Sequence, residues 1–75
     1  MTESFKYEYG QTVRVVASAP VSLKPGTNVA VVGMTRLDQE REVLKVRCLV
    51  GTDIYLVEYA DGTSIEVPEQ YIEPA

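Results

Sequence analysis

Apolar and polar residues alternate along much of the chain, and many of the apolar positions hold β-branched residues. Phe5, Tyr7 and Tyr9 alternate with charged residues, and Val13 and Val15 flank a single arginine. A period of two places successive side chains on opposite faces of a strand. No long window keeps apolar residues at the spacing of an amphipathic helix. The pattern therefore predicts an all-β fold.

Turn-forming residues divide the chain into short strands. Two prolines and a glycine predict a long loop over 18–27, closed by a Pro25–Gly26 turn. Gly33 predicts a bulge or sharp bend within a strand, and 38–42 is expected to form a charged turn, the one place for a short helical turn. We expect strands over 12–17, 28–37, 43–50, 54–60 and 63–67, with a last short strand at Ile72.

The last third of the chain carries the clearest local signals. Asp61–Gly62 between two apolar runs is typical of a β-hairpin. Pro68 cannot continue a strand ladder, and 68–71 is expected to form one 3₁₀ turn before the final strand. The candidate core residues are the inward positions of these strands: Val13, Val15, Val31, Val46, Tyr55, Val57, Ile65 and Ile72.

Residues 57–73 (VEYADGTSIEVPEQYIE) resemble the closing hairpin and final strand of SH3-like small barrels, the group that includes Tudor and KOW domains, and residues 9–15 (YGQTVRV) resemble their opening strand. The resemblance implies one domain over 1–75, an SH3-like barrel of five to six antiparallel strands with one 3₁₀ turn before the last strand. Residues 1–9 would add an extra edge strand. The short, acidic chain also resembles, more weakly, the immunity-type small barrels of bacterial polymorphic toxin systems.

The cysteine and histidine counts limit the kinds of cross-link, metal site and catalysis expected of the chain. Cys48 is the only cysteine and the chain has no histidine, so neither an internal disulfide nor a Cys–His zinc site is expected. The commonest general base is also missing. Cys48 shares the apolar face of 43–50 with Leu44, Val46 and Val50, which predicts a buried structural thiol. We expect no enzyme activity, no metal and no cofactor.

Charge is unevenly distributed. Residues 51–75 contain six acids and no Lys or Arg, and the whole chain carries a net charge of −4. One interpretation is an electronegative face that attracts a basic protein; the other is a solvated outer face. The negative charge opposes binding to nucleic acid. The acids are Asp53, Glu58, Asp61, Glu66, Glu69 and Glu73.

The aromatic residues leave two alternatives open. Phe5, Tyr7 and Tyr9 either cover an open end of the barrel or form an edge strand that pairs with another chain, which would give a homodimer. The resemblance to Tudor domains implies that tyrosines 55, 59 and 71 could form a cage for a methylated cation, but tyrosines 55 and 59 share a strand face with Val57, which favours core. The candidate partner-binding residues are Phe5, Tyr7, Tyr9, Asp53, Glu58, Asp61, Glu66, Glu69 and Tyr71.

These observations favour a binding protein. The acidic start lacks the features of a signal peptide, and no run of residues is apolar enough to span a membrane, so we expect a cytoplasmic protein. The leading hypothesis is a non-catalytic protein-interaction module, either an immunity-like inhibitor or a small accessory subunit. The alternative is binding of nucleic acid or a modified peptide by a Tudor- or KOW-like barrel.

Overall fold

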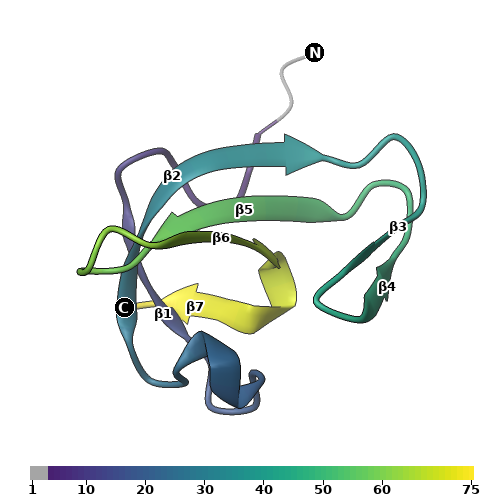
Figure 1. Ribbon diagram of the computed structural model, residues 1–75. Helices are drawn as coiled ribbons and strands as arrows, with labels where there is room; N and C mark the ends of the chain where they lie inside the picture. The colour runs from purple at the N-terminus through teal and green to yellow at the C-terminus, as the bar shows by residue number, and fades with distance from the viewer. Residues whose placement is uncertain (1–3) are drawn as a thin grey trace.

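The computed structural model describes residues 4–75, and within them the chain is all-β, as the alternation predicts (Figure 1). Its secondary structure consists of seven strands and two 3₁₀ turns. In chain order these are β1 (Thr12–Val15), η1 (Val21–Leu23), β2 (Asn28–Arg36), β3 (Arg41–Val43), β4 (Val46–Cys48), β5 (Asp53–Glu58), β6 (Ser64–Pro68), η2 (Glu69–Tyr71) and β7 (Ile72–Pro74).

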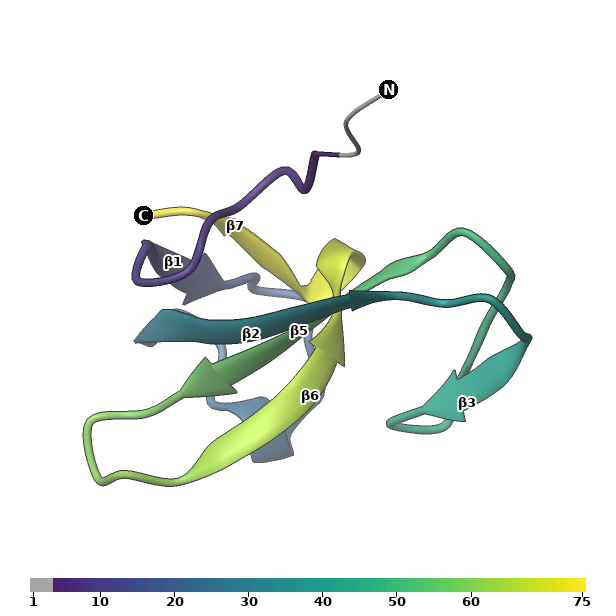
Figure 2. The same ribbon diagram turned by 90° about the horizontal axis from the view of Figure 1, so that it is seen from above.

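Five strands form one strongly curved antiparallel sheet in the order β6-β5-β2-β1-β7, and β3 and β4 form a separate hairpin beside it (Figures 1 and 2). The end strands β6 and β7 are joined in sequence by η2 but are not hydrogen-bonded to each other in the described part of the chain. The sheet therefore has two edges and is not closed into a complete barrel.

The predicted bulge lies in the longest strand. The register between β2 and β5 shifts between Val31 and Gly33. A Cβ atom on Gly33 would approach the Cβ atom of Leu56 to 3.3 Å, a tight contact, so glycine suits this position. Because the bulge increases local twist, it allows β2 to curve across the sheet.

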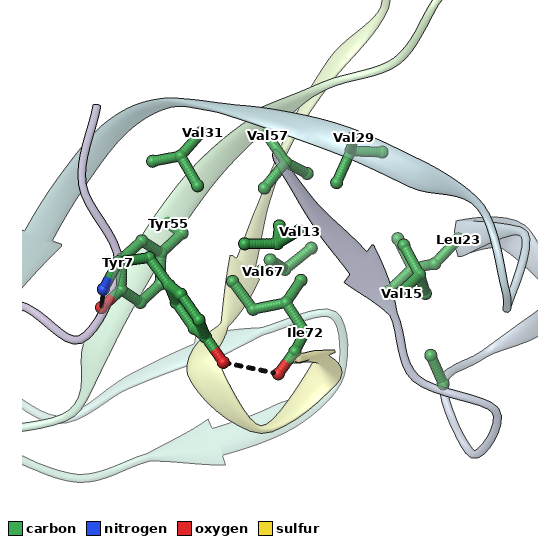
Figure 3. Close-up of a cluster of buried hydrophobic side chains, with 11 residues drawn as sticks. Tyr7, Val13, Val15, Leu23, Val29, Val31, Tyr55, Val57, Val67 and Ile72 are labelled. Atoms are coloured by element: carbon green, nitrogen blue, oxygen red, sulfur yellow. Dashed lines mark hydrogen bonds between the residues drawn. The ribbon is translucent and has the colours of Figure 1, made fainter. Parts of the chain in front are cut away.

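The main core lies on the concave side of the curved sheet, where the alternating strand positions meet (Figure 3). Six of the eight predicted core residues are buried, but Val46 and Ile65 are only half-buried. The sequence interpretation missed Leu23, which η1 places in the core, and the depth of Tyr7. The buried cluster consists of Tyr7, Val13, Val15, Ala19, Leu23, Val29, Val31, Tyr55, Val57, Val67 and Ile72.

The prediction of one strand over 43–50 is wrong. Leu44 and Lys45 adopt positive φ angles of 53° and 65°, and they reverse the chain between β3 and β4. Arg41 and Glu42, expected in a charged turn, belong to β3. The hairpin exists because it buries a second apolar cluster at the far end of β2 and β5, formed by Leu37, Val43, Cys48 and Ile54.

The predicted closing elements are confirmed. The β5–β6 hairpin turns at Asp61–Gly62, with Gly62 at a φ of 89° and the Tyr59 N–H donating to the Thr63 carbonyl oxygen. The predicted 3₁₀ turn is η2, and β7 follows it at Ile72. The strand ends differ from the predicted ones by a few residues.

The predicted edge strand over 1–9 is not a strand in residues 4–9, and its first three residues lie outside the described part of the chain. The segment forms bends and a turn, and its aromatic residues do not share one face. Tyr7 is buried, Phe5 is half-buried and Tyr9 is 74% exposed. The physical reason is that Tyr7 stabilises the fold more by entering the core than by standing on an edge.

Candidate functional site

The two edges of the sheet differ, and the edge at β7 is closed. The Ile72 N–H donates to the Glu69 carbonyl oxygen, and the Tyr7 hydroxyl donates to the Ile72 carbonyl oxygen at 3.4 Å (Figure 3). Pro74 has no N–H to offer. These contacts and Pro74 leave little of the β7 edge for another strand to pair with.

The edge at β6 is hydrogen-bonded to no further strand in the described part of the chain, although β3 approaches it. The Tyr59 N–H bonds to the Thr63 carbonyl oxygen, and the register pairs Val57 with Ile65. Because hydrogen-bonded and non-bonded pairs alternate in an antiparallel ladder, Ile65 and Val67 bond to β5. The N–H and C=O groups of Ser64 and Glu66 consequently point away from the sheet.

A hollow accompanies this edge between β6 and the β3–β4 hairpin. Its volume is about 280 Å³, and the half-buried Ile65 forms part of its wall. A salt bridge of 2.7 Å between Arg41 on β3 and Glu66 on β6 spans it. The wall is formed by Arg41, Glu42, Val43, Leu44, Ile65 and Glu66.

A second, smaller hollow of about 90 Å³ lies on the other side of Ile65, between the η1 loop and the β5–β6 hairpin. The Tyr59 hydroxyl donates to the Leu23 carbonyl oxygen at 2.5 Å, which ties the two segments together. The Lys24 ammonium lies 5.9 Å from the centre of the Tyr59 ring. The Ile65 side chain therefore separates two hollows along one open strand edge.

The acidic residues of the last third differ in their charged neighbours. Three of them pair with arginines from the first part of the chain, so much of the charge asymmetry is neutralised within the fold. The pairs are Asp53 with Arg36 at 2.6 Å, Glu66 with Arg41 at 2.7 Å, and Glu73 with Arg14 at 2.9 Å.

The other acids have different surroundings. Glu69 accepts a hydrogen bond of 3.4 Å from the Tyr55 hydroxyl. Asp61 accepts a backbone hydrogen bond from Thr63, and this bond holds the pKa of its exposed carboxyl below the usual value.

Glu58 is exposed and has no salt bridge within residues 4–75. Since Glu58 pairs with Ser64, it lies beside the open edge.

The aromatic candidates mostly pack inside. The rings of Phe5 and Tyr7 contact the Tyr55 ring edge-on, with centroids 6.2 and 5.4 Å away, and the Arg36 guanidinium lies over Phe5. Burial raises the pKa of Tyr55 above its ordinary value. Tyr71 is half-buried against the core. Of the two alternatives for the N-terminal aromatic residues, the structure places Phe5 and Tyr7 over an end of the core and leaves Tyr9 exposed.

The described residues contain few other groups that could react or bind a metal ion. Cys48 is buried in the second cluster, as predicted for a structural thiol. No group of three or more Cys, Asp or Glu side chains in 4–75 is arranged to hold a metal ion. Over the same residues, no helix has the length and apolar character needed to cross a membrane.

Comparison of the chain with protein-family models, curated proteins and solved structures finds no match. The function is therefore inferred from this chain's own geometry. Sequence reasoning singled out Glu58 and Glu66 and assigned Ile65 to the core, but it did not select Ser64 or Ile65 as site residues. The signal that could have found them is the position of their strand: it is the second strand of the last hairpin and ends at Pro68, as an outer strand does.

Proposed function

We propose that the chain is a non-catalytic protein-interaction module, either an immunity-like inhibitor or a small accessory subunit, acting in the cytoplasm. The observation that carries this proposal is the difference between the sheet edges. Contacts from Tyr7 and Glu69 cover β7, whereas the outward backbone groups of Ser64 and Glu66 have no partner in residues 4–75 and lie beside an apolar side chain. Proteins usually cover or interrupt an exposed strand edge. An edge left open next to two hollows is suited to binding another chain.

We further propose that the fold is an SH3-like small barrel. The order of elements supports this: β1 pairs with both β2 and β7, a long loop follows β1, and η2 directly precedes the last strand. In this interpretation the β3–β4 hairpin is an addition between the second strand of the barrel and its third, which are β2 and β5. Such a fold by itself is compatible with many functions.

The charge distribution favours a protein partner over nucleic acid. Binding to nucleic acid depends on Lys and Arg side chains that neutralise phosphates. Here Arg14, Arg36 and Arg41 already form salt bridges, and the net charge is −4. No specific arrangement of the described residues favours the nucleic-acid alternative.

The modified-peptide alternative also lacks a favourable observation. A cage needs aromatic faces open to solvent. Tyr55 is fully buried, and the Tyr59 hydroxyl is bonded to Leu23 while Lys24 lies over its ring. We therefore keep the protein-interaction proposal alone.

The proposal is tested by affinity capture and titration together. The immobilised protein is incubated with an extract of its native cells, with the heat-unfolded protein as the control. We expect a protein retained in stoichiometric amount by the folded form alone, and no salt-sensitive binding of generic DNA or RNA in an anisotropy titration at low salt. Salt-sensitive binding of nucleic acid without a retained protein would contradict the proposal.

A further inference from the structure

We propose that the open edge of β6 binds an extended segment of a partner protein as an added antiparallel strand, with an aliphatic side chain opposite Ile65 and a cationic side chain opposite Ser64. This inference rests on the proposed function and specifies its site and the chemistry of its partner.

The backbone of β6 offers a short row of hydrogen-bonding groups. Ser64 and Glu66 are the non-bonded partners of Glu58 and Leu56 in the β5 ladder, so both their N–H and C=O groups face outward. Pro68 ends the row because it has no N–H. An added strand would therefore pair over a few residues centred on Ile65, the recognition mode known as β-augmentation.

The side chain opposite Ile65 would be apolar. Directly opposed residues in a sheet point to the same face. Ile65 points toward the core side and is half-buried between the hollows of about 280 and 90 Å³. Val43 and Leu44 line one hollow and Tyr59 the other. An aliphatic side chain placed there would extend the main core past the edge of the sheet.

The side chain opposite Ser64 would be cationic. Residues opposite Ser64 and Glu66 point to the outer face, which also carries Glu58. Glu58 has no salt bridge among the described residues, and Arg41 contacts the Oε1 atom of Glu66. Opposite charges on neighbouring strands attract, whereas like charges directly opposed destabilise a sheet. A lysine or arginine opposite Ser64 would lie close to the Glu58 carboxylate.

The same charges argue against a second copy of this chain as the occupant. Two β6 strands pairing antiparallel about Ile65 would place the partner's Glu66 opposite Ser64. That carboxylate would lie on the outer face beside Glu58, the neighbour of Ser64 on β5. Because Glu66 already pairs with Arg41 of its own chain, a second copy would bring no unpaired cation to Glu58, so the edge is better matched to a basic segment.

The test uses a short synthetic peptide of alternating valine and lysine as the probe. Two N-methylated forms provide the matched controls. In an antiparallel added strand, methylation of the backbone amide nitrogens of the lysines blocks the groups expected to bond to β6, and methylation of those of the valines does not. A valine–glutamate peptide tests the charge. We expect saturable binding of the parent and valine-methylated peptides, with amide chemical shift changes centred on residues 64–66, and much weaker binding of the other two.

Two protein variants test the same edge by changing β6 instead of the peptide. Ser64→Pro removes the outward N–H without breaking the ladder to β5, and Ser64→Ala keeps it. We expect Ser64→Pro to weaken peptide binding by at least about tenfold, equivalent to about 1.4 kcal/mol, and Ser64→Ala to leave it nearly unchanged. If Ser64→Pro does not fold, the comparison of the two N-methylated peptides still tests whether the peptide bonds to the edge of β6.

Three results would overturn the inference: equal binding of both methylated peptides, tighter binding of the glutamate peptide, or a dimer through β6 in sedimentation. Its failure is distinguishable from failure of the proposed function. A partner captured equally by the Ser64→Pro and wild-type proteins would leave the protein-interaction function standing and move the site elsewhere. Loss of that partner in Ser64→Pro, with retention in Ser64→Ala, would support both.

Discussion

The Tyr7 hydroxyl donates a hydrogen bond to the Ile72 carbonyl oxygen, which joins the N-terminal segment to the last strand (Figure 3). The Tyr7 N–H also donates to the Tyr55 hydroxyl at 3.3 Å, and the two rings meet edge-on. One side chain thus covers an end of the core and occupies the outward carbonyl of β7. This arrangement leaves β6 as the edge available for pairing.

Truncation of Tyr7 should be strongly destabilising. Tyr7 is 2% exposed, so Tyr7→Ala removes a buried ring and leaves a cavity, at a cost of about 3 to 5 kcal/mol. Tyr7→Phe loses only the long hydrogen bond to Ile72 and should cost about 0.5 to 1 kcal/mol. Urea denaturation measures both. A loss below about 0.5 kcal/mol for Tyr7→Ala would mean that residues 4–9 do not pack on the core.

The sheet register is tested at Val57, which is fully buried. Val57→Ala should cost about 1.5 to 3 kcal/mol through lost burial and a cavity. Val21→Ala is the matched control: Val21 is 88% exposed, and its change should stay within about 0.5 kcal/mol. Similar values for the two variants in urea denaturation would show that Val57 faces solvent and that the register is shifted by one residue.

The β3–β4 turn predicts a stabilising substitution. Lys45 is exposed and has a φ of 65°, a conformation that costs most residues free energy but not glycine. Lys45→Gly should raise the free energy of unfolding by about 0.5 to 1 kcal/mol. Lys45→Val should lower it, because a β-branched residue is strained there. The opposite order of these two variants in thermal or urea unfolding would argue against the hairpin.

The Leu44–Lys45 turn is an element that the local sequence does not predict. Asp61–Gly62 predicts a turn because aspartate and glycine favour turn conformations. Leu44–Lys45 has no such local preference and lies in an alternating apolar pattern that predicts a continuous strand. The turn forms because β3 and β4 bury Val43 and Cys48 with Leu37 and Ile54, a gain that only the folded chain supplies. Tertiary burial thus overrides the local pattern.

The candidate site, too, was predictable from the sequence only in part. The acids near the open edge were predictable from composition, and Tyr55 and Val57 from alternation. The pairing of the acidic third with arginines, as in Asp53 with Arg36, depends on which strands become neighbours. The entry of Tyr7 into the core likewise depends on the position of Tyr55 across the sheet. Neither relationship is visible in local sequence.

Stability should fall in alkaline solution. Burial raises the pKa of both Tyr55 and Tyr59 above the ordinary value of 10.0. The folded state therefore holds these protons more tightly than the unfolded state, and its stabilisation is complete below pH 10 and lost as pH rises through the folded pKa values. Urea midpoints across this range should decline in the wild-type protein and less in Tyr55→Phe. Val21→Ala, at an exposed position that carries no titratable group, should decline like the wild type.

The central claim is that β6 has an open edge that a partner covers. The most direct measurement is amide hydrogen exchange by NMR across residues 64–67, with and without the captured partner or the valine–lysine peptide. In the free protein we predict slow exchange at Ile65 and Val67, which bond to β5, and fast exchange at Ser64 and Glu66. Binding should slow exchange at Ser64 and Glu66. Slow exchange at both in the free protein, or fast exchange at both in the saturated complex, would contradict the account.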